Sequence, residues 1–354
     1  MKNSIFTRTP FFYNMKQVTY FILFIFVVNI SCKSTQQKHT NVNKTTTSKT
    51  LIKPPYLKKG DTVVIISPAG ILFNKKAEIE QAKKLLKSWD LNVILGKNIF
   101  NQNNQFAGTD IERASDFQKA LDTKNIKAIW CSRGGYGSVR ILDKLDFSKF
   151  IAHPKWIIGY SDITVFHNQI HNLGIESIHG MMGISLDKNL EYLEENSNSL
   201  KNAIFGNQLT YTIKSSNYNK LGEATGQLVG GNLTLLHTML GSKTTINTDG
   251  KILFIEEIGE YAYHIDRMLQ SLKRAGYFEN CKGIIVGDIS NVKKNSTSWG
   301  KPMEQLILDI VEEYNFPVLF NFPAGHKEKN LALILGRTVD LKVKKDKSTL
   351  LFKK

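Results

Sequence analysis

The sequence predicts an α/β fold, with an N-terminal doubly wound and mostly parallel sheet domain followed by a C-terminal mixed α/β domain. Two observations support this prediction. From residue 61 onward, short β-branched and aliphatic runs alternate with segments of helical spacing, which is typical of parallel strands joined by right-handed crossovers. Beyond residue 330, apolar runs follow one another without a helix between them, which favours antiparallel pairing.

The N-terminal domain is expected over residues 53–186. Its predicted strands lie at 61–67, 91–95, 126–131, 156–158 and 177–179, and its predicted helices lie at 75–88, 109–122 and 138–145. Continuous β-branched strands are typical of a sheet that is buried on both faces. Ligands of such sheets bind beyond the carboxyl ends of the strands. We therefore expect the loops 67–70, 132–137 and 159–162 to converge on a site.

The remainder of the chain is expected to hold a linker at 187–220, with a helix at 190–203, and a C-terminal domain at 221–354. The glycine pair Gly230-Gly231 is expected to break the strand pattern at its start. The other predicted strands lie at 251–256, 283–287, 317–322, 331–335, 338–343 and 348–352, and the predicted helices lie at 233–240, 261–275 and 302–314.

Ser161 follows the buried strand at 156–158 and precedes an amphipathic helical segment. Gly159 permits a tight turn because it has no Cβ atom. A serine on such a turn is held out of the sheet and near helix N–H groups that can stabilise an oxyanion. This is the geometry of a nucleophile elbow. The signature G-x-S-x-G is incomplete, because Ile163 fills its last position, and a simple helix cap is the alternative interpretation.

The loop Ser132-Arg-Gly-Gly-Tyr-Gly137 is rich in glycines that let backbone N–H groups approach a ligand. It lacks the third glycine of G-x-G-x-x-G and follows the third predicted strand, so nucleotide binding is disfavoured. We instead expect a cradle for an oxyanion or a carboxylate, with Arg133 as a possible partner for an anion.

Glu256 and His326 each lie at the polar end of an apolar strand. An acid that orients a histidine base would complete the logic of a serine triad. The alternatives are a solvated glutamate and a turn histidine. His167 and His171 have a spacing that could bind zinc, but no H-E-x-x-H and no third ligand accompany them, so packing histidines are predicted. His179 could face the site or simply pack.

The chain has a formal net charge of +16. Its lysines are scattered among acids and form no basic stripe interleaved with aromatic residues, so we predict no nucleic-acid partner. Cys131 and Cys281 lie beside apolar runs and are predicted to be buried thiols, since two cysteines make no disulfide framework.

Residues 1–31 resemble a bacterial lipoprotein signal. The apolar run from Val18 to Val28 is too short for a confident membrane span and fits a secretory h-region. Ser31 precedes Cys32, which would be lipidated and become the mature N-terminus. Asn29 stands where leucine is usual, and an ordinary signal peptide or a membrane anchor is the alternative.

The segment 32–52 is polar and is predicted to be a disordered tether. The true start can be Met1 or Met15. Together, signal and tether predict export to the cell envelope or periplasm and attachment to a membrane through a lipid.

Five short motifs occur in order: Ser132-Arg-Gly-Gly-Tyr-Gly137; Ile158-Gly-Tyr-Ser-Asp162; Gly226-x-Leu-x-Gly-Gly-Asn232; Phe254-Ile-Glu-Glu257 with Ile265-Asp-Arg-Met-Leu269; and Pro323-Ala-Gly-His326. Together they resemble the LD-carboxypeptidases, or muramoyltetrapeptide carboxypeptidases, of serine peptidase family S66. The resemblance runs from about residue 54 to the C-terminus.

The resemblance implies a triad of Ser161 as nucleophile, Glu256 as orienting acid and His326 as base, in a cleft between the two domains. Glu257 is the fallback acid. It also implies oxyanion donors at the backbone N–H groups of Asp162 and Gly135. Arg133 and Tyr136 are the residues expected to bind substrate. No metal and no organic cofactor are implied.

The implied reaction removes the terminal D-alanine from peptidoglycan tetrapeptides by cleaving its bond to an L-diamino acid. An immunity-type hydrolase of peptidyl-nucleotide antibiotics and a non-catalytic muropeptide-binding lipoprotein are the alternatives. Family members that recycle muropeptides resemble cytoplasmic enzymes, so the predicted export favours envelope substrates here. The family also allows a homodimer.

Overall fold

The computed structural model describes residues 51–187, 190–294 and 296–354. These described residues all belong to one compact unit. The predicted signal, Cys32 and nearly all of the predicted tether lie outside the described residues. Among the residues that are described, no helix is long and apolar enough to cross a membrane.

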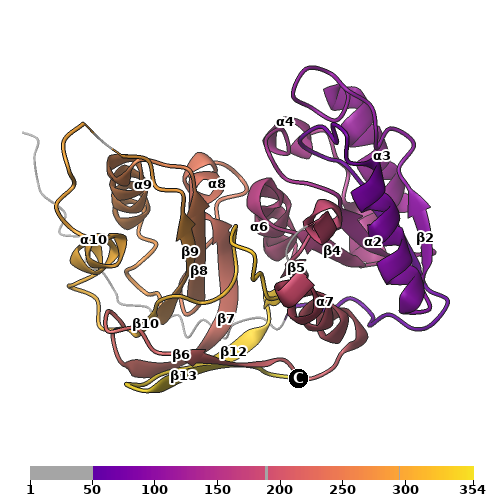
Figure 1. Cartoon of the computed structure of the whole chain (residues 1–354). Coiled ribbons are helices and arrows are strands. Elements are labelled where there is room, and N and C mark those ends of the chain that lie inside the picture. The colour runs from indigo at the N-terminus through magenta and orange to yellow at the C-terminus, as the bar shows by residue number, and fades with distance from the viewer. Residues whose placement is uncertain (1–50, 188–189, 295) are drawn as a thin grey trace, which may run out of the picture. The chain divides into compact units, whose positions relative to one another are not determined.

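The first sheet has six strands in the order β11-β5-β4-β3-β1-β2. Figure 1 labels β5, β4 and β2 of this sheet. The bounds of the six strands are β1 Thr62–Ile66, β2 Asn92–Leu95, β3 Ile126–Cys131, β4 Trp156–Gly159, β5 Ser177–His179 and β11 Leu333–Leu335. All neighbours pair in parallel except β11, which is antiparallel to β5. This sheet confirms the predicted N-terminal fold.

Helices cover both faces of the first sheet. They are α2 Lys76–Ser88, α3 Asp110–Asp122, α4 Val139–Leu142, α5 Ser148–Ala152 and α6 Thr164–Asn172, with the short 3-10 helix η1 Ser161–Ile163 before α6. Alternate residues of β1 point to opposite faces. Val63 and Ile65 pack with α2 in one apolar cluster, whereas Val64 and Ile66 pack with α3 and α6 in another. This arrangement makes the sheet doubly wound.

The second sheet has seven strands in the order β10-β9-β8-β7-β12-β13-β6. They are β6 Thr210–Lys214, β7 Gly222–Asn232, β8 Ile252–Ile258, β9 Gly283–Ser290, β10 Val318–Leu319, β12 Thr338–Val343 and β13 Lys347–Phe352. The strands from β7 to β10 are parallel, and the others pair antiparallel. Helices α8 Leu233–Thr238, α9 Ala262–Arg274 and α10 Met303–Ile310 pack on it through a third apolar cluster.

The expectation that Gly230-Gly231 breaks a strand is wrong, because β7 continues through both glycines. Close packing is the physical reason for the pair. A Cβ atom on Gly230 would lie 1.9 Å from the carbonyl oxygen of Phe254, and one on Gly231 would lie 2.5 Å from Oγ1 of Thr164. The glycines therefore let β7 approach both β8 and the first turn of α6 (Figure 1).

The segment predicted as a linker holds α7 Leu190–Phe205, which confirms the helix predicted at 190–203, and strand β6, which was not predicted. The short 3-10 helix η2 Gly183–Asp187 precedes α7. Leu200 and Ile204 of α7 belong to an apolar cluster that also contains residues of β1, β12 and β13. This cluster therefore joins the two sheets, and β11 from the C-terminal part of the chain also pairs with β5 of the first sheet.

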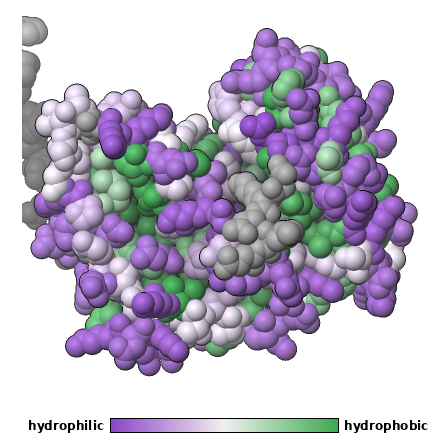
Figure 2. Space-filling view, in the orientation of Figure 1, coloured by the Kyte–Doolittle hydropathy of each residue, from purple (hydrophilic) through white to green (hydrophobic). Residues whose placement is uncertain are grey.

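The surface is polar on the face drawn in Figure 2, where hydrophobic residues appear in separate patches. This agrees with the scattered charges of the sequence. Cys131 and Cys281 are both buried and unpaired, as predicted.

Candidate active site

Ser161 lies on a strained turn at the carboxyl end of β4. Its φ angle is +62°, a left-handed conformation that costs a residue with a Cβ atom roughly 1–2 kcal/mol. The turn also requires a glycine before it, because a Cβ atom on Gly159 would lie 2.8 Å from Cγ1 of Ile163. Strained backbone of this kind gathers at functional sites. The turn has the strand–turn–helix geometry expected of a nucleophile elbow.

His326 joins Ser161 to Glu256. Its Nε2 atom lies 3.0 Å from Oγ of Ser161, and its Nδ1 atom lies 2.6 Å from Oε2 of Glu256. Glu256 is fully buried. The ring of Tyr160 packs edge-on against the His326 ring with 5.1 Å between centroids. The three polar side chains therefore form one hydrogen-bonded chain that spans the two sheets.

Glu257 does not face His326. Adjacent residues of a strand point to opposite faces of the sheet. The Glu257 carboxylate accepts hydrogen bonds from the backbone N–H and the hydroxyl of Thr234, both at 2.7 Å, and from Nδ2 of Asn232 at 3.2 Å. Burial raises the pKa of Glu257. Its contacts hold the start of α8 against β8, so the fallback acid lies away from the serine.

The glycine loop lies directly against Ser161. A Cβ atom on Gly134 would sit 3.1 Å from Oγ of Ser161 and 3.4 Å from the backbone nitrogen of Asp162. The space beside Gly134 is thus within reach of both a nucleophile and an N–H donor. The Gly134 carbonyl accepts from the Gly70 N–H at 3.0 Å. Because the peptide bond is trans, the Gly135 N–H points away from Gly70.

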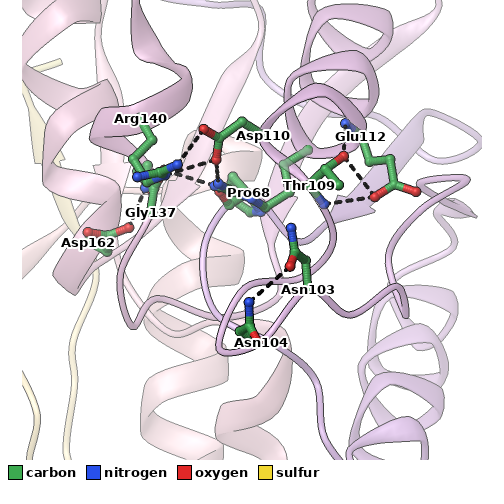
Figure 3. A network of polar contacts seen from close by, with 11 residues as sticks. Pro68, Asn103, Asn104, Thr109, Asp110, Glu112, Gly137, Arg140 and Asp162 are labelled. Atoms are coloured by element: carbon green, nitrogen blue, oxygen red, sulfur yellow. Dashed lines mark hydrogen bonds and ion pairs between the residues drawn. The ribbon is translucent and has the colours of Figure 1, made fainter.

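A buried arginine ties the loops of the site together. Nη1 of Arg113 donates to the carbonyl oxygens of Pro68 at 2.6 Å and Gly137 at 2.8 Å, and Nη2 pairs with Asp110. Figure 3 shows these three partners, together with Arg140, which also pairs with Asp110. Next to this network, Oδ2 of Asp162 accepts from the Ser138 N–H at 2.8 Å. Burial raises the pKa of Asp162. The Asp162 side chain therefore anchors the glycine loop to the elbow.

Sequence reasoning did not identify Arg113. A signal was available, because Arg113 stands four residues before Phe117 on the buried face of α3, and a charged residue on a buried helix face needs polar partners.

Two family models match the chain. The LD-carboxypeptidase N-terminal domain matches residues 63–180, and the LD-carboxypeptidase C-terminal domain matches residues 225–341. The probable murein peptide carboxypeptidase of Bacillus subtilis is 39% identical over 288 residues, which cover 80% of this chain and 89% of that protein. The chain belongs to the LD-carboxypeptidase family. It is therefore a hydrolase of the serine carboxypeptidase type.

Solved structures agree with this assignment. The muramoyltetrapeptide carboxypeptidase of Oxalobacter formigenes aligns with a TM-score of 0.75 and 27% identity, covering 83% of this chain and 99% of that one. The microcin C7 self-immunity protein MccF, in complex with aspartyl sulfamoyl adenosine, aligns with a TM-score of 0.77 over 86% of this chain and 98% of its own. Its identity is 23%, so this second likeness concerns the fold alone.

A cavity of about 740 Å³ opens beside His326 in this LD-carboxypeptidase. Its lining residues are Tyr192, Ser290, Asn291, His326, Lys327, Glu328 and Lys329. The two residues expected to bind substrate lie on the glycine loop and not among them. Nη1 of Arg133 donates to the carbonyl oxygen of Ile71, and the half-exposed Tyr136 packs 5.8 Å from the ring of Phe106.

Two buried histidines of the first domain, His167 and His179, have packing roles. The Nδ1 atom of His167 lies 2.8 Å from the Ser177 hydroxyl, and its Nε2 lies 2.9 Å from the carbonyl oxygen of Gly159. This is the packing histidine that was predicted. His179 is fully buried between the rings of Tyr160 and Phe254. Burial lowers the pKa of His167 to about 4, and burial also lowers the pKa of His179 well below its ordinary value. Within the part of the chain that the structure describes, no cluster of potential metal ligands occurs.

Proposed function

We propose that this enzyme removes the terminal D-alanine from peptidoglycan tetrapeptides, with Ser161 as nucleophile, His326 as base and Glu256 as the orienting acid. The observation that carries this proposal is the continuous hydrogen-bonded chain from the Ser161 hydroxyl through both nitrogens of His326 to Glu256. Such a chain lets a histidine accept the serine proton while a buried carboxylate stabilises the imidazolium.

The reaction then follows in two steps. His326 takes the Ser161 proton as Oγ attacks the carbonyl carbon of the diamino acid, and the oxyanion accepts hydrogen bonds from the N–H groups of Asp162 and Gly135. The imidazolium gives the proton to the departing amine of D-alanine, which leaves an acyl-enzyme on Ser161. Water, deprotonated by His326, hydrolyses this ester and releases the tripeptide.

The substrate proposal rests on family membership and on the reactions that relatives' names record. The Bacillus subtilis relative is named for murein peptides, and the Oxalobacter formigenes structure is named for a muramoyltetrapeptide. A cavity of this size beside His326 suits a peptide rather than a single amino acid.

The first test is a substrate comparison. The chain from residue 53 onward is incubated with a tetrapeptide that ends in D-alanine, with its L-alanine diastereomer, and with an aspartyl-nucleotide analogue. We expect alanine release only from the D-terminal peptide. Cleavage of the nucleotide analogue alone would favour the immunity-type function instead. That alternative is retained because MccF shares the fold. Aromatic residues in the linker would also favour it, and one of them, Tyr192, lines the cavity.

We further propose that the chain is exported and anchored to a membrane through a lipid on Cys32, since the sequence before it resembles a lipoprotein signal. Labelling of cells with a fatty-acid analogue tests this directly. The full-length protein should carry the label in the membrane fraction, and Cys32→Ala should not. Equal labelling of both would rule out Cys32 as the modified residue.

A further inference from the structure

Asp288 is a buried carboxylate that contacts the loop carrying His326 and has no part in the mechanism proposed above. It lies near the end of β9 and is 6% exposed. Its backbone N–H donates to the carbonyl oxygen of Ala324 at 3.0 Å, and its Oδ2 accepts from the Lys327 N–H at 2.9 Å. One aspartate thus holds the loop on both sides of His326.

The packing of Gly325 places this carboxylate next to the triad acid. Gly325 has a φ angle of +135°, and a Cβ atom on it would lie 3.2 Å from both Oδ2 of Asp288 and Cβ of Glu256. The Asp288 and Glu256 side chains therefore flank the residue that immediately precedes His326. No larger residue fits there, so the loop is fixed between two acids.

The charges around this loop interact with one another. Burial raises the pKa of Asp288, and the nearby charge of Glu256 raises it further, whereas Lys327 and His326 lower it. The ammonium group of Lys327 lies 3.7 Å from Oδ1 of Asp288 but is itself largely exposed. The titratable groups that face His326 are Glu256 on β8, Asp288 on β9, Lys327 on its own loop, Tyr160 after β4 and His179 on β5.

We propose that Asp288 is a positioning residue that fixes the His326 loop and adds a second negative charge to stabilise the His326 imidazolium. This inference rests on the proposed function of His326 as the base. The backbone contacts set the ring in line with Ser161. The Asp288 carboxylate acts on the His326 ring through space, because the Glu256 carboxylate already forms the hydrogen bond at Nδ1 of that ring.

Asp288→Asn separates the two effects, because an asparagine Oδ1 still accepts from the Lys327 N–H but carries no charge. We expect this variant to fold normally, to lose about 3- to 10-fold in kcat/KM, and to show the acidic limb of its pH–rate profile at a pH lower by roughly half a unit to one unit. Asp288→Ala also removes the hydrogen bond and should lose more. Asp309→Asn, at an exposed aspartate of α10 paired with Lys301, is the matched control and should behave like wild type.

A second measurement needs no substrate. NMR titration of the His326 ring should show its midpoint at lower pH in Asp288→Asn and at higher pH in Lys327→Met, which removes the opposing positive charge. An unchanged midpoint in Asp288→Asn, or wild-type kcat/KM in Asp288→Ala, would overturn the proposal. If the wild type does not cleave tetrapeptides at all, the proposed function fails, and the NMR titration still decides the role of Asp288.

Discussion

The Nε2 atom of His326 lies 3.0 Å from Oγ of Ser161, although 165 positions separate the two residues in the chain. Their meeting depends on the contact between the two sheets. Thr164, in the first turn after Ser161, accepts a hydrogen bond from the Asn232 N–H at 3.0 Å, and Gly231 lets the two backbones come this close. The elbow is thereby fixed against β7, which lies next to the strand that carries Glu256.

Removal of the serine hydroxyl should abolish activity without harming the fold. Ser161→Ala should lower kcat by about 10⁴-fold or more, as loss of a triad nucleophile does. Ser161→Gly should be equally inactive but more stable than Ser161→Ala by about 1 kcal/mol, because only glycine adopts a positive φ without strain. Thermal unfolding of the two variants measures this difference. A less stable glycine variant would contradict the strained elbow.

The two adjacent acids should respond differently to substitution. Glu256→Gln should lower kcat by about 10²- to 10⁴-fold with little change in KM, because the amide no longer stabilises the imidazolium. Glu257→Gln, the matched change one residue along, should keep activity within about tenfold of wild type, because its partners are Asn232 and Thr234. Steady-state kinetics of both variants decide between the acids, and the reverse order of effects would assign the role to Glu257.

Gly134→Ala should block the reaction while the protein stays folded. The added methyl group would sit 3.1 Å from Oγ of Ser161 and 3.4 Å from the Asp162 nitrogen, in the space assigned to the reacting carbonyl. We expect at least a 100-fold loss of kcat/KM, on the scale of a lost oxyanion donor. Gly180→Ala is the control, since its methyl group would meet Ala332 at an ordinary 3.5 Å. Equal activity of the two variants would place the reacting carbonyl elsewhere.

Acid should destabilise the protein through His167. Its pKa is lowered to about 4 from an ordinary 6.5 by burial, so the neutral ring stabilises the fold. That contribution is fully present above pH 6.5 and is lost as the pH falls toward 4. The shift corresponds to about 3 kcal/mol of unfolding free energy.

The comparison that isolates this effect is urea unfolding of wild type and His167→Gln between pH 4 and 7.5. As the pH falls, the free energy of unfolding should decrease less steeply in the variant than in the wild type. The difference between the two slopes should correspond to the uptake of at most one proton on unfolding. The raised pKa values of Asp162 and Glu257 act in the opposite direction in both proteins and cancel in the difference. Parallel curves for the two proteins would contradict the burial of a neutral His167.

Much of the first domain could be predicted from its residues. The β-branched run that forms β1 and the apolar run before Ser161 are signals that local sequence carries by itself. The turn at Ser161 was recognisable because Gly159 and the following helical spacing surround it. Strand β6 was missed, because it lies at a sheet edge and buries only Ile213, which leaves a polar pattern.

The convergence of the site was not predictable from residue patterns alone. Whether Glu256 or Glu257 faces His326 depends on the register of β8, and the meeting of His326 with Ser161 depends on how two sheets pack. The resemblance to a family supplied the roles, but it gave no indication of Arg113 or Asp288. Both act through the backbone of neighbouring loops, which no sequence motif records.

The most direct test of the account is mass spectrometry of a tetrapeptide that ends in D-alanine after incubation with the wild type and with Ser161→Ala, both from residue 53 onward. Loss of one alanine residue with the wild type alone is the result that we predict. Equal loss with both proteins would contradict the assignment of Ser161 as the nucleophile, and no loss with either would contradict the proposed substrate.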